Sequence, residues 1–212
     1  MKKVLVLGAG GRIAKWVIQM LADARDIQLT LVLRDAKRLH GDAPANARVI
    51  AGDVLDGKRL ASAMAGQDIV YANLTGDDID IQAKGIVESM KAAGVRRLLF
   101  VASLGIYDEV PGKFGKWNRR QIGAYLPPFR RAADAIEVSE VDYTILRPAW
   151  LTDNDEVDYE TTEKGEPFKG TEVSRKSVAE LVVKIIRSPK LHSKRNIGVD
   201  KPNTDGDKPA FY

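Results

Sequence analysis

The stretch Val4-Leu5-Val6-Leu7-Gly8-Ala9-Gly10-Gly11-Arg12-Ile13-Ala14 decides the fold. Its run of four apolar residues is typical of a strand that is buried on both faces. The glycines that follow predict a tight turn, and the apolar residues after the turn recur at helical spacing. A buried strand, a glycine turn and an amphipathic helix in this order indicate the first unit of a parallel α/β sheet.

The glycine turn is also the main candidate for a binding site. Gly8 permits the tight turn, Gly11 lets the backbone approach a pyrophosphate without an intervening Cβ, and Ala14 is small enough for close packing. We expect the free N–H groups at the helix start to bind phosphate oxygens. The residues expected to contact a dinucleotide here are Gly8, Gly10, Gly11, Arg12 and Ile13. The alternative is a glycine turn with a purely structural role.

The rest of the chain alternates β-rich runs with amphipathic stretches. The predicted strands are residues 4–7, 28–33, 48–51, 68–73, 97–102 and 142–146, and the predicted helices are 12–24, 60–65, 79–93, 130–139 and 174–186. We therefore expect one α/β domain over residues 1–212, a doubly wound Rossmann-type fold with helices on both faces of a mostly parallel sheet. The expected strand order is 3-2-1-4-5-6, with room for a short edge strand. We place substrate or lid elements within residues 104–130 and 151–172.

Composition narrows the function. The 212 residues include 33 lysines and arginines and 29 aspartates and glutamates, so the net charge of +4 is modest. The absence of cysteine excludes disulfides and thiolate chemistry, and the two histidines, His40 and His192, are too few for a histidine-rich metal site. We expect no metal, no direct nucleic-acid binding, no membrane association and a cytoplasmic protein. The sequence leaves a monomer and a dimer open.

Two segments concentrate charge of one sign. Residues 113–131 carry six basic residues and no acid, and residues 153–166 carry seven acids and one lysine. The simpler interpretation is a pair of solvated loops, which is what charge runs usually are. The alternative is a lid whose basic half attracts an anionic substrate.

Residues after the next strands help to choose the cofactor. Arg34 follows the second strand, where its guanidinium would pair with a 2′-phosphate, so we expect NADP. Asp35 is one residue further and would favour NAD, which remains the alternative. Asp53 and Val54 follow the third strand and are expected at the adenine, although Asp53 could instead cap the next helix. Leu74 and Thr75 follow the fourth strand, where the nicotinamide ribose should pass.

Together these motifs resemble the atypical short-chain dehydrogenase/reductase group, in its NmrA-like and biliverdin-IX-beta-reductase-like branch. The resemblance rests on residues 4–14, 32–35, 52–54, 99–103, 142–148 and 173–179. It implies a Rossmann fold that binds NAD(P) through the glycine loop, Arg34, Asp53, Val54, Leu74, Thr75 and Ser103. It also implies that the loop Pro148-Ala149-Trp150 lies beside the nicotinamide.

The usual catalytic pair of this superfamily, Tyr-x-x-x-Lys, is broken. Tyr125 is followed four residues later by Phe129, and counting back from Arg147-Pro148 instead gives Leu126 and Arg130. A leucine has no proton to give, and an arginine does not titrate usefully. Ordinary alcohol dehydrogenase chemistry is therefore not expected.

Ser103 and Tyr107 remain as candidate catalytic residues. Ser103 would hydrogen-bond the nicotinamide amide or a substrate carbonyl, or it satisfies backbone groups at the strand end. Tyr107 would line the pocket or donate a proton, or it packs at the sheet edge. Trp117 and Trp150 flank the expected cleft and would stack on a flat substrate or pack in the core.

A dinucleotide site beside a broken proton relay favours one kind of enzyme. We expect an NADPH-dependent oxidoreductase that transfers hydride to a small aromatic or conjugated acceptor of the quinone, flavin or tetrapyrrole type. The first alternative is a non-enzymatic NmrA-like sensor of NADP(H) redox state. The second is an NAD-dependent enzyme of the epimerase or dehydratase type.

Overall fold

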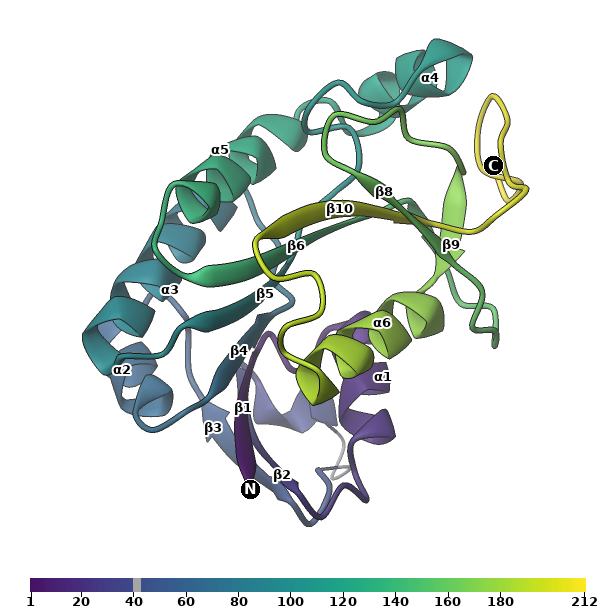
Figure 1. Cartoon of the computed structure of the whole chain (residues 1–212). Coiled ribbons are helices and arrows are strands. Elements are labelled where there is room, and N and C mark those ends of the chain that lie inside the picture. The colour runs from purple at the N-terminus through teal and green to yellow at the C-terminus, as the bar shows by residue number, and fades with distance from the viewer. Residues whose placement is uncertain (40–42) are drawn as a thin grey trace.

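The computed structural model describes residues 1–39 and 43–212, and its main feature is an eight-stranded sheet (Figure 1). The strand order is β3-β2-β1-β4-β5-β6-β10-β8. The strands of this sheet are β1 (Lys2–Leu7), β2 (Ile27–Leu33), β3 (Ala47–Ala51), β4 (Ile69–Ala72), β5 (Arg97–Val101), β6 (Asp142–Pro148), β8 (Glu160–Glu163) and β10 (Arg195–Asp200). All neighbours pair in parallel except β8, which runs antiparallel to β10. The predicted Rossmann-type fold and its 3-2-1-4-5-6 order are confirmed, with two further strands at one edge.

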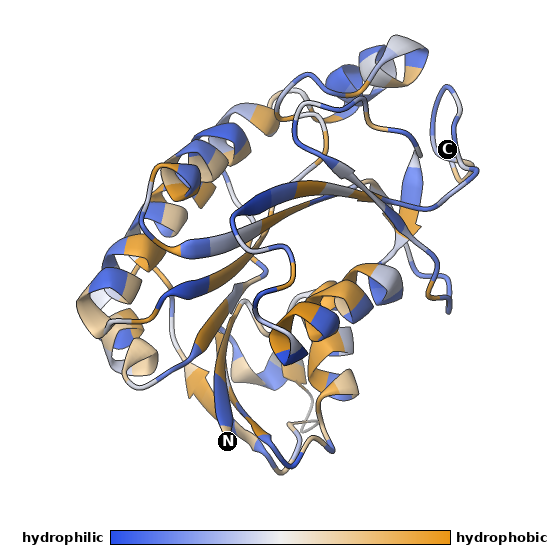
Figure 2. Cartoon of the chain, viewed as in Figure 1, coloured by the Kyte–Doolittle hydropathy of each residue, from blue (hydrophilic) through white to orange (hydrophobic). Residues whose placement is uncertain are grey.

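Helices cover both faces of this sheet. Helices α1 (Arg12–Met20) and α6 (Arg175–Arg187) pack together on one face, and α2 (Gly57–Met64), α3 (Ile79–Ala93) and α5 (Leu126–Glu137) cover the other (Figure 1). Apolar residues gather on the inner strands (Figure 2). Strand β1 serves both cores, because Val4 and Val6 face α1 and α6 whereas Leu5 and Leu7 face the other helices. This alternation explains why the sequence of β1 is apolar without interruption.

The segment from residue 113 to 131 differs from the expected loop. It forms α4 (Gly112–Ile122) and the first turns of α5. The buried side of α4 carries only Phe114, Gly115, Trp117 and Asn118. Gly115 is required there because a Cβ would collide with the Val110 carbonyl group. The helix escapes prediction because only three large apolar side chains, those of Phe114, Trp117 and Ile122, stand among four basic residues and two glycines.

The two charged segments do not pair with each other among the described residues. The basic segment forms ion pairs that join Lys113 to Asp207, Arg119 to Asp108, Arg130 to Asp134 and Arg131 to Asp80. The acidic segment pairs mainly with bases elsewhere, as in Asp153 with Arg175 and Glu156 with Lys201. It includes β8 and lies between β7 (Trp150–Thr152) and β9 (Glu172–Ser174), which form a small parallel sheet. None of the helices described is both long and apolar enough to cross a membrane.

Candidate functional site

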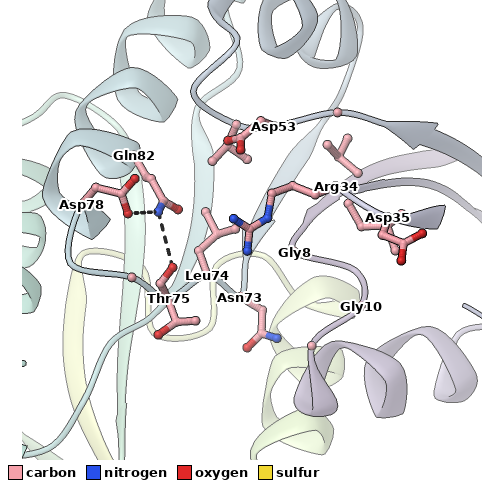
Figure 3. A pocket seen from close by; sticks show the side chains of 16 residues that line it. Gly8, Gly10, Arg34, Asp35, Asp53, Asn73, Leu74, Thr75, Asp78 and Gln82 are labelled. Atoms are coloured by element: carbon pink, nitrogen blue, oxygen red, sulfur yellow. Dashed lines mark hydrogen bonds between the residues drawn. The ribbon is translucent and has the colours of Figure 1, made fainter. Parts of the chain in front are cut away.

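The carboxyl ends of β1, β2, β3 and β4 surround a cavity of about 490 Å³ (Figure 3). It lies where ligands bind in open parallel sheets. Eight of the residues predicted from the sequence line it: Gly8, Gly10, Gly11, Arg34, Asp53, Val54, Leu74 and Thr75. The remaining lining residues are Val32, Leu33, Asp35, Gly52, Asn73, Gly76, Asp78 and Gln82.

The glycine loop is held by the two neighbouring strands. The amides of Gly8 and Ala9 donate to the Val32 carbonyl of β2, at 3.0 and 3.1 Å. Gly8 has φ +79°, and a Cβ on it would strike the Asn73 carbonyl group. A Cβ on Gly11 would strike the Asn73 side chain. The loop therefore needs glycine for its own packing against the end of β4, in addition to any close approach of a ligand.

Helix α1 begins with unsatisfied donors. Its N-cap is Gly11, which has no capping side chain, and its first turn contains no acid. Within the described part of the chain, the amides of Arg12 and Ile13 have no backbone acceptor. By contrast, Asp56 caps α2 and Ser174 caps α6 through side-chain oxygens. The N–H groups without a backbone acceptor and the helix dipole make this end of α1 suitable for an anion such as a diphosphate.

Arg34 and Asp35 lie differently at the cavity. The exposed Arg34 side chain extends into it, and its guanidinium has no ion pair within the described residues, whereas the Asp35 carboxylate is turned outward (Figure 3). Asp35 Oδ1 accepts a hydrogen bond of 3.0 Å from the Lys37 amide at the start of η1 (Ala36–Leu39). The guanidinium is thus free to receive a second anion.

Polar groups of β3, β4 and α3 complete the cavity. Asp53 Oδ1 accepts from the Leu55 amide at 3.0 Å, and the helix-capping alternative for Asp53 is wrong because Asp56 is the cap. Gln82 Nε2 donates to Asp78 Oδ1 at 2.6 Å and to the Thr75 carbonyl at 3.4 Å. Asn73, Asp78 and Gln82 were not among the predicted site residues. The spacing of Asp78 and Gln82 by four residues at a helix start is the signal that could have found them.

Arg12 and Ile13 do not line this cavity. The Ile13 side chain is buried in the core between α1 and the sheet. The Arg12 guanidinium forms an ion pair with Asp153, so it reaches the segment after β7.

The second group of predicted residues lies together at the ends of β5 and β6, beyond the lining of the cavity. The Leu104 amide donates to the Pro148 carbonyl at 3.3 Å, which sets Ser103 beside the Pro148-Ala149-Trp150 loop. Ser103 Oγ donates to the Leu104 carbonyl at 3.2 Å. The Trp150 ring lies 4.8 Å from Trp117 and 5.1 Å from Tyr212 between ring centroids.

Tyr107 has structural partners. Its hydroxyl accepts a hydrogen bond of 2.9 Å from Asn196 Nδ2, and the Arg130 and Lys164 cations lie 4.3 and 4.2 Å from its ring centroid. Burial, followed by the nearby Glu137 carboxylate, raises the pKa of Tyr107. This arrangement favours packing over proton donation for Tyr107, whose catalytic role stays a prediction.

The Ser103–Tyr107 loop is organised by Glu109, which no local sequence pattern indicates as a site residue. Its carboxylate accepts from the Gly105 amide at 3.0 Å and from the Tyr107 amide at 2.9 Å. It also forms an ion pair with Arg147 of β6. The Glu109 carbonyl accepts from the Phe168 amide at 2.9 Å. One residue thus joins the loop after β5 to the segment before β9.

No metal centre is found among the described residues, where no three His, Asp or Glu side chains are grouped as ligands. His40 lies outside the described residues.

The sheet, the glycine loop and the uncapped helix define the class: a Rossmann-fold dinucleotide-binding protein. The NAD(P)H-binding family matches residues 8–189, and the chain belongs to this family. Among curated proteins, it is 50% identical to Protein YmjC of Escherichia coli (strain K12) over 46 residues, which are 22% of this chain and 77% of YmjC.

Solved structures extend this similarity over the whole chain. A Rossmann-fold NAD(P)-binding family protein from Shigella flexneri is 55% identical, with 100% of both chains covered and a TM-score of 0.87. A short-chain dehydrogenase/reductase from Veillonella parvula DSM 2008 in complex with NADP is 28% identical, with 99% of both chains covered and a TM-score of 0.90. ChuY, an anaerobillin reductase from Escherichia coli O157:H7, shares the fold at 21% identity, with 97% of this chain and 100% of ChuY covered and a TM-score of 0.81.

Proposed function

We propose that this protein is an NADPH-dependent reductase of a flat, conjugated acceptor. The observation that carries the choice of cofactor is the Arg34 guanidinium, which extends into the cavity without an ion pair in the described part of the chain. An arginine fork at this place suits a 2′-phosphate, and the Asp35 carboxylate is engaged by the Lys37 amide instead of facing a ribose. The similar Veillonella parvula structure holds NADP.

The residues of the cavity suit the adenine half and the diphosphate of this cofactor, and the nicotinamide half would lie beyond the cavity. The amides at the start of α1 would hold the diphosphate, and Asp53 and Val54 would border the adenine. Leu74 and Thr75 lead from this cavity toward Ser103 and the Pro148-Ala149-Trp150 loop, where the nicotinamide end would lie. When bound, the reduced cofactor supplies a hydride.

The kind of acceptor follows from the groups beside that end. In one register the positions of the usual catalytic pair hold Leu126, which is buried, and Arg130, which pairs with Asp134 at 2.8 Å. In the other they hold Tyr125, which is exposed, and Phe129. Neither register provides the complete Tyr-Lys proton relay. A conjugated acceptor tolerates this, because solvent can supply its proton after hydride transfer. The half-buried Trp150 ring, which packs on the buried Trp117, offers apolar surface at the Pro148-Ala149-Trp150 loop, and the fold also serves an anaerobillin reductase.

Titration of the purified protein with NADPH, NADH and their oxidised forms tests the cofactor. We expect NADPH to bind at least about tenfold more tightly than NADH, since a charge-assisted fork contributes about 1.5–3 kcal/mol. Arg34→Met should remove this preference, and Arg48→Met, on the neighbouring strand, is the control. Equal affinity of the unaltered protein for both cofactors would contradict NADP specificity.

Turnover tests the reductase itself. NADPH oxidation is followed with a panel of quinones, flavins and linear tetrapyrroles, and at least one should give steady turnover. Tight NADPH binding with no turnover on any acceptor would reject the reductase. A difference in affinity between NADPH and NADP⁺ would then support the sensor alternative, since only differential affinity shifts a conformational equilibrium.

A further inference from the structure

The chain brings one of its own carboxylates to the start of α1. The Arg12 guanidinium, from the first residue of the helix, pairs with Asp153 from the segment after β7. A basic residue at a helix N-terminus is unfavourable next to the positive end of the dipole, and α1 has no cap or acid of its own to offset it. The Asp153 carboxylate therefore offsets the positive charge at this end of α1 through its ion pair with Arg12.

We propose that Asp153 is a placeholder anion that sets cofactor affinity: it holds Arg12 in the free protein and gives it up to the diphosphate of the bound dinucleotide. The proposal rests on the proposed function, because it needs a dinucleotide at the glycine loop. Asp153 acts through Arg12 and touches no reacting atom, so it is a positioning residue.

The two oxygens of Asp153 have separate partners. Oδ1 accepts from Arg175 Nη1 at 2.9 Å, and the same Nη1 donates to the Leu151 carbonyl at 3.1 Å. Oδ2 contacts Arg12 Nη2. Loss of Arg12 would therefore leave Asp153 with one charged partner and an unchanged anchor on β7.

Exposure identifies Arg12 as the partner that is exchanged. The Arg12 side chain is 63% exposed, whereas that of Arg175 is 16% exposed. An exposed ion pair is weak because water screens it, and a diphosphate offers Arg12 more negative charge than one carboxylate does. Arg12 can thus move to the ligand while Arg175 keeps Asp153 and its segment in place.

The test compares dissociation constants for NADPH, measured by calorimetry on the full chain. Asp153→Asn keeps the shape and an acceptor for Arg175 but removes the competing charge. Asp155→Asn is the matched control, because it removes the same charge from an exposed residue of the same segment. Asp155 pairs with Lys176 and not with Arg12. We expect Asp153→Asn to bind NADPH about two- to fivefold more tightly than Asp155→Asn, the range that an exposed ion pair supports.

A double-mutant cycle separates competition for Arg12 from simple repulsion of the ligand. Arg12→Met should weaken NADPH binding. In the Arg12→Met background, Asp153→Asn should leave the NADPH affinity unchanged. Equal gains in both backgrounds would mean repulsion and would overturn the proposal. Weaker binding by Asp153→Asn alone would mean that Asp153 prepares Arg12 for the ligand and would also overturn it.

These outcomes are distinct from failure of the proposed function. If the unaltered protein binds none of the four nicotinamide dinucleotides at millimolar concentration, the proposed function and the role of Asp153 both fall. If it binds NADPH and Asp153→Asn matches Asp155→Asn, only the role of Asp153 falls.

Discussion

Arg147 and Glu109 form an ion pair from which solvent is removed: their side chains are 0% and 4% exposed. Arg147 Nε also donates to Asn196 Oδ1 at 2.9 Å, so β6, β10 and the loop after β5 meet at this pair. The Gly105 and Tyr107 amides point at the same carboxylate. The loop that carries Ser103 is thus held by the buried Glu109 carboxylate, whose charge is balanced by Arg147.

Removal of that carboxylate charge should cost stability. Glu109→Gln leaves the Arg147 charge buried without a counter-ion, which typically costs about 3–5 kcal/mol. Urea unfolding measures the loss, and Glu140→Gln, at an exposed position, is the control. The double variant Glu109→Gln/Arg147→Met should recover part of the loss, because neither position of the pair then carries a charge. A single variant as stable as the control would show that the pair contributes little.

Asp200 should make stability depend on pH. It is fully buried, Oδ2 accepts from the Gly170 amide at 2.8 Å, and Oδ1 has no partner among the described residues. Burial raises the pKa of Asp200 to about 6 from 3.8. The folded state therefore binds this proton more tightly than the unfolded state does, so its stabilising contribution is complete below about pH 4 and is lost as pH rises through 6.

Asp200→Asn should remove this dependence. Between pH 4 and pH 7 the unaltered protein should lose on the order of 1–3 kcal/mol of unfolding free energy more than the variant does. Asp205→Asn, in the exposed segment nearby, should behave like the unaltered protein. Parallel pH profiles of the Asp200→Asn and unaltered proteins would contradict the raised pKa.

Gly11 and Asn73 should prove to be coupled. Gly11→Ala places a methyl group against the Asn73 side chain, so we expect NADPH affinity to fall about tenfold or more as the loop shifts. Gly85→Ala, in α3 with open space around the added Cβ, should bind normally and gain about 0.5–1 kcal/mol of stability. Asn73→Ala added to Gly11→Ala should restore part of the affinity. Calorimetric titration that finds no loss with Gly11→Ala would show that the loop yields easily.

Tyr107→Phe separates a structural from a catalytic hydroxyl. Loss of the hydrogen bond from Asn196 should cost about 1 kcal/mol in unfolding free energy, because phenylalanine keeps the ring that the cations contact. If the hydroxyl is structural, kcat should stay within about threefold of the unaltered value. Stability and turnover are measured on the same preparation. A fall in kcat of a hundredfold or more would instead support Tyr107 as the proton donor.

Regular elements with local signals were predictable from the sequence. The helix expected over residues 79–93 has these bounds in the structure, because its apolar spacing is unbroken and Gly94 ends it with φ +71°. The sheet order followed from the alternation of strands and helices. The glycine loop and Arg34 were found because a dinucleotide fold places them directly after strands.

The elements and site residues that could not be predicted depend on contacts between residues that are distant in the sequence. Strand β10 has only Ile197 and Val199 as apolar residues and gains its place by pairing with β6 and β8. Asn73 could not be predicted because its role depends on contact with the glycine loop, which lies far from it in the sequence. Glu109 could not be predicted because its partner, Arg147, lies 38 residues further along the chain. No local pattern encodes such pairs, since the sequence separation hides the contact.

The bond from the Phe168 amide to the Glu109 carbonyl has a consequence for motion. It joins the two stretches, residues 104–130 and 151–172, in which substrate or lid elements are expected. A bulky acceptor could enter only if both stretches moved together or if this hydrogen bond broke first. Amide exchange of Phe168 and Tyr107 should consequently report a single shared opening rate, slowed equally for both once an acceptor is held.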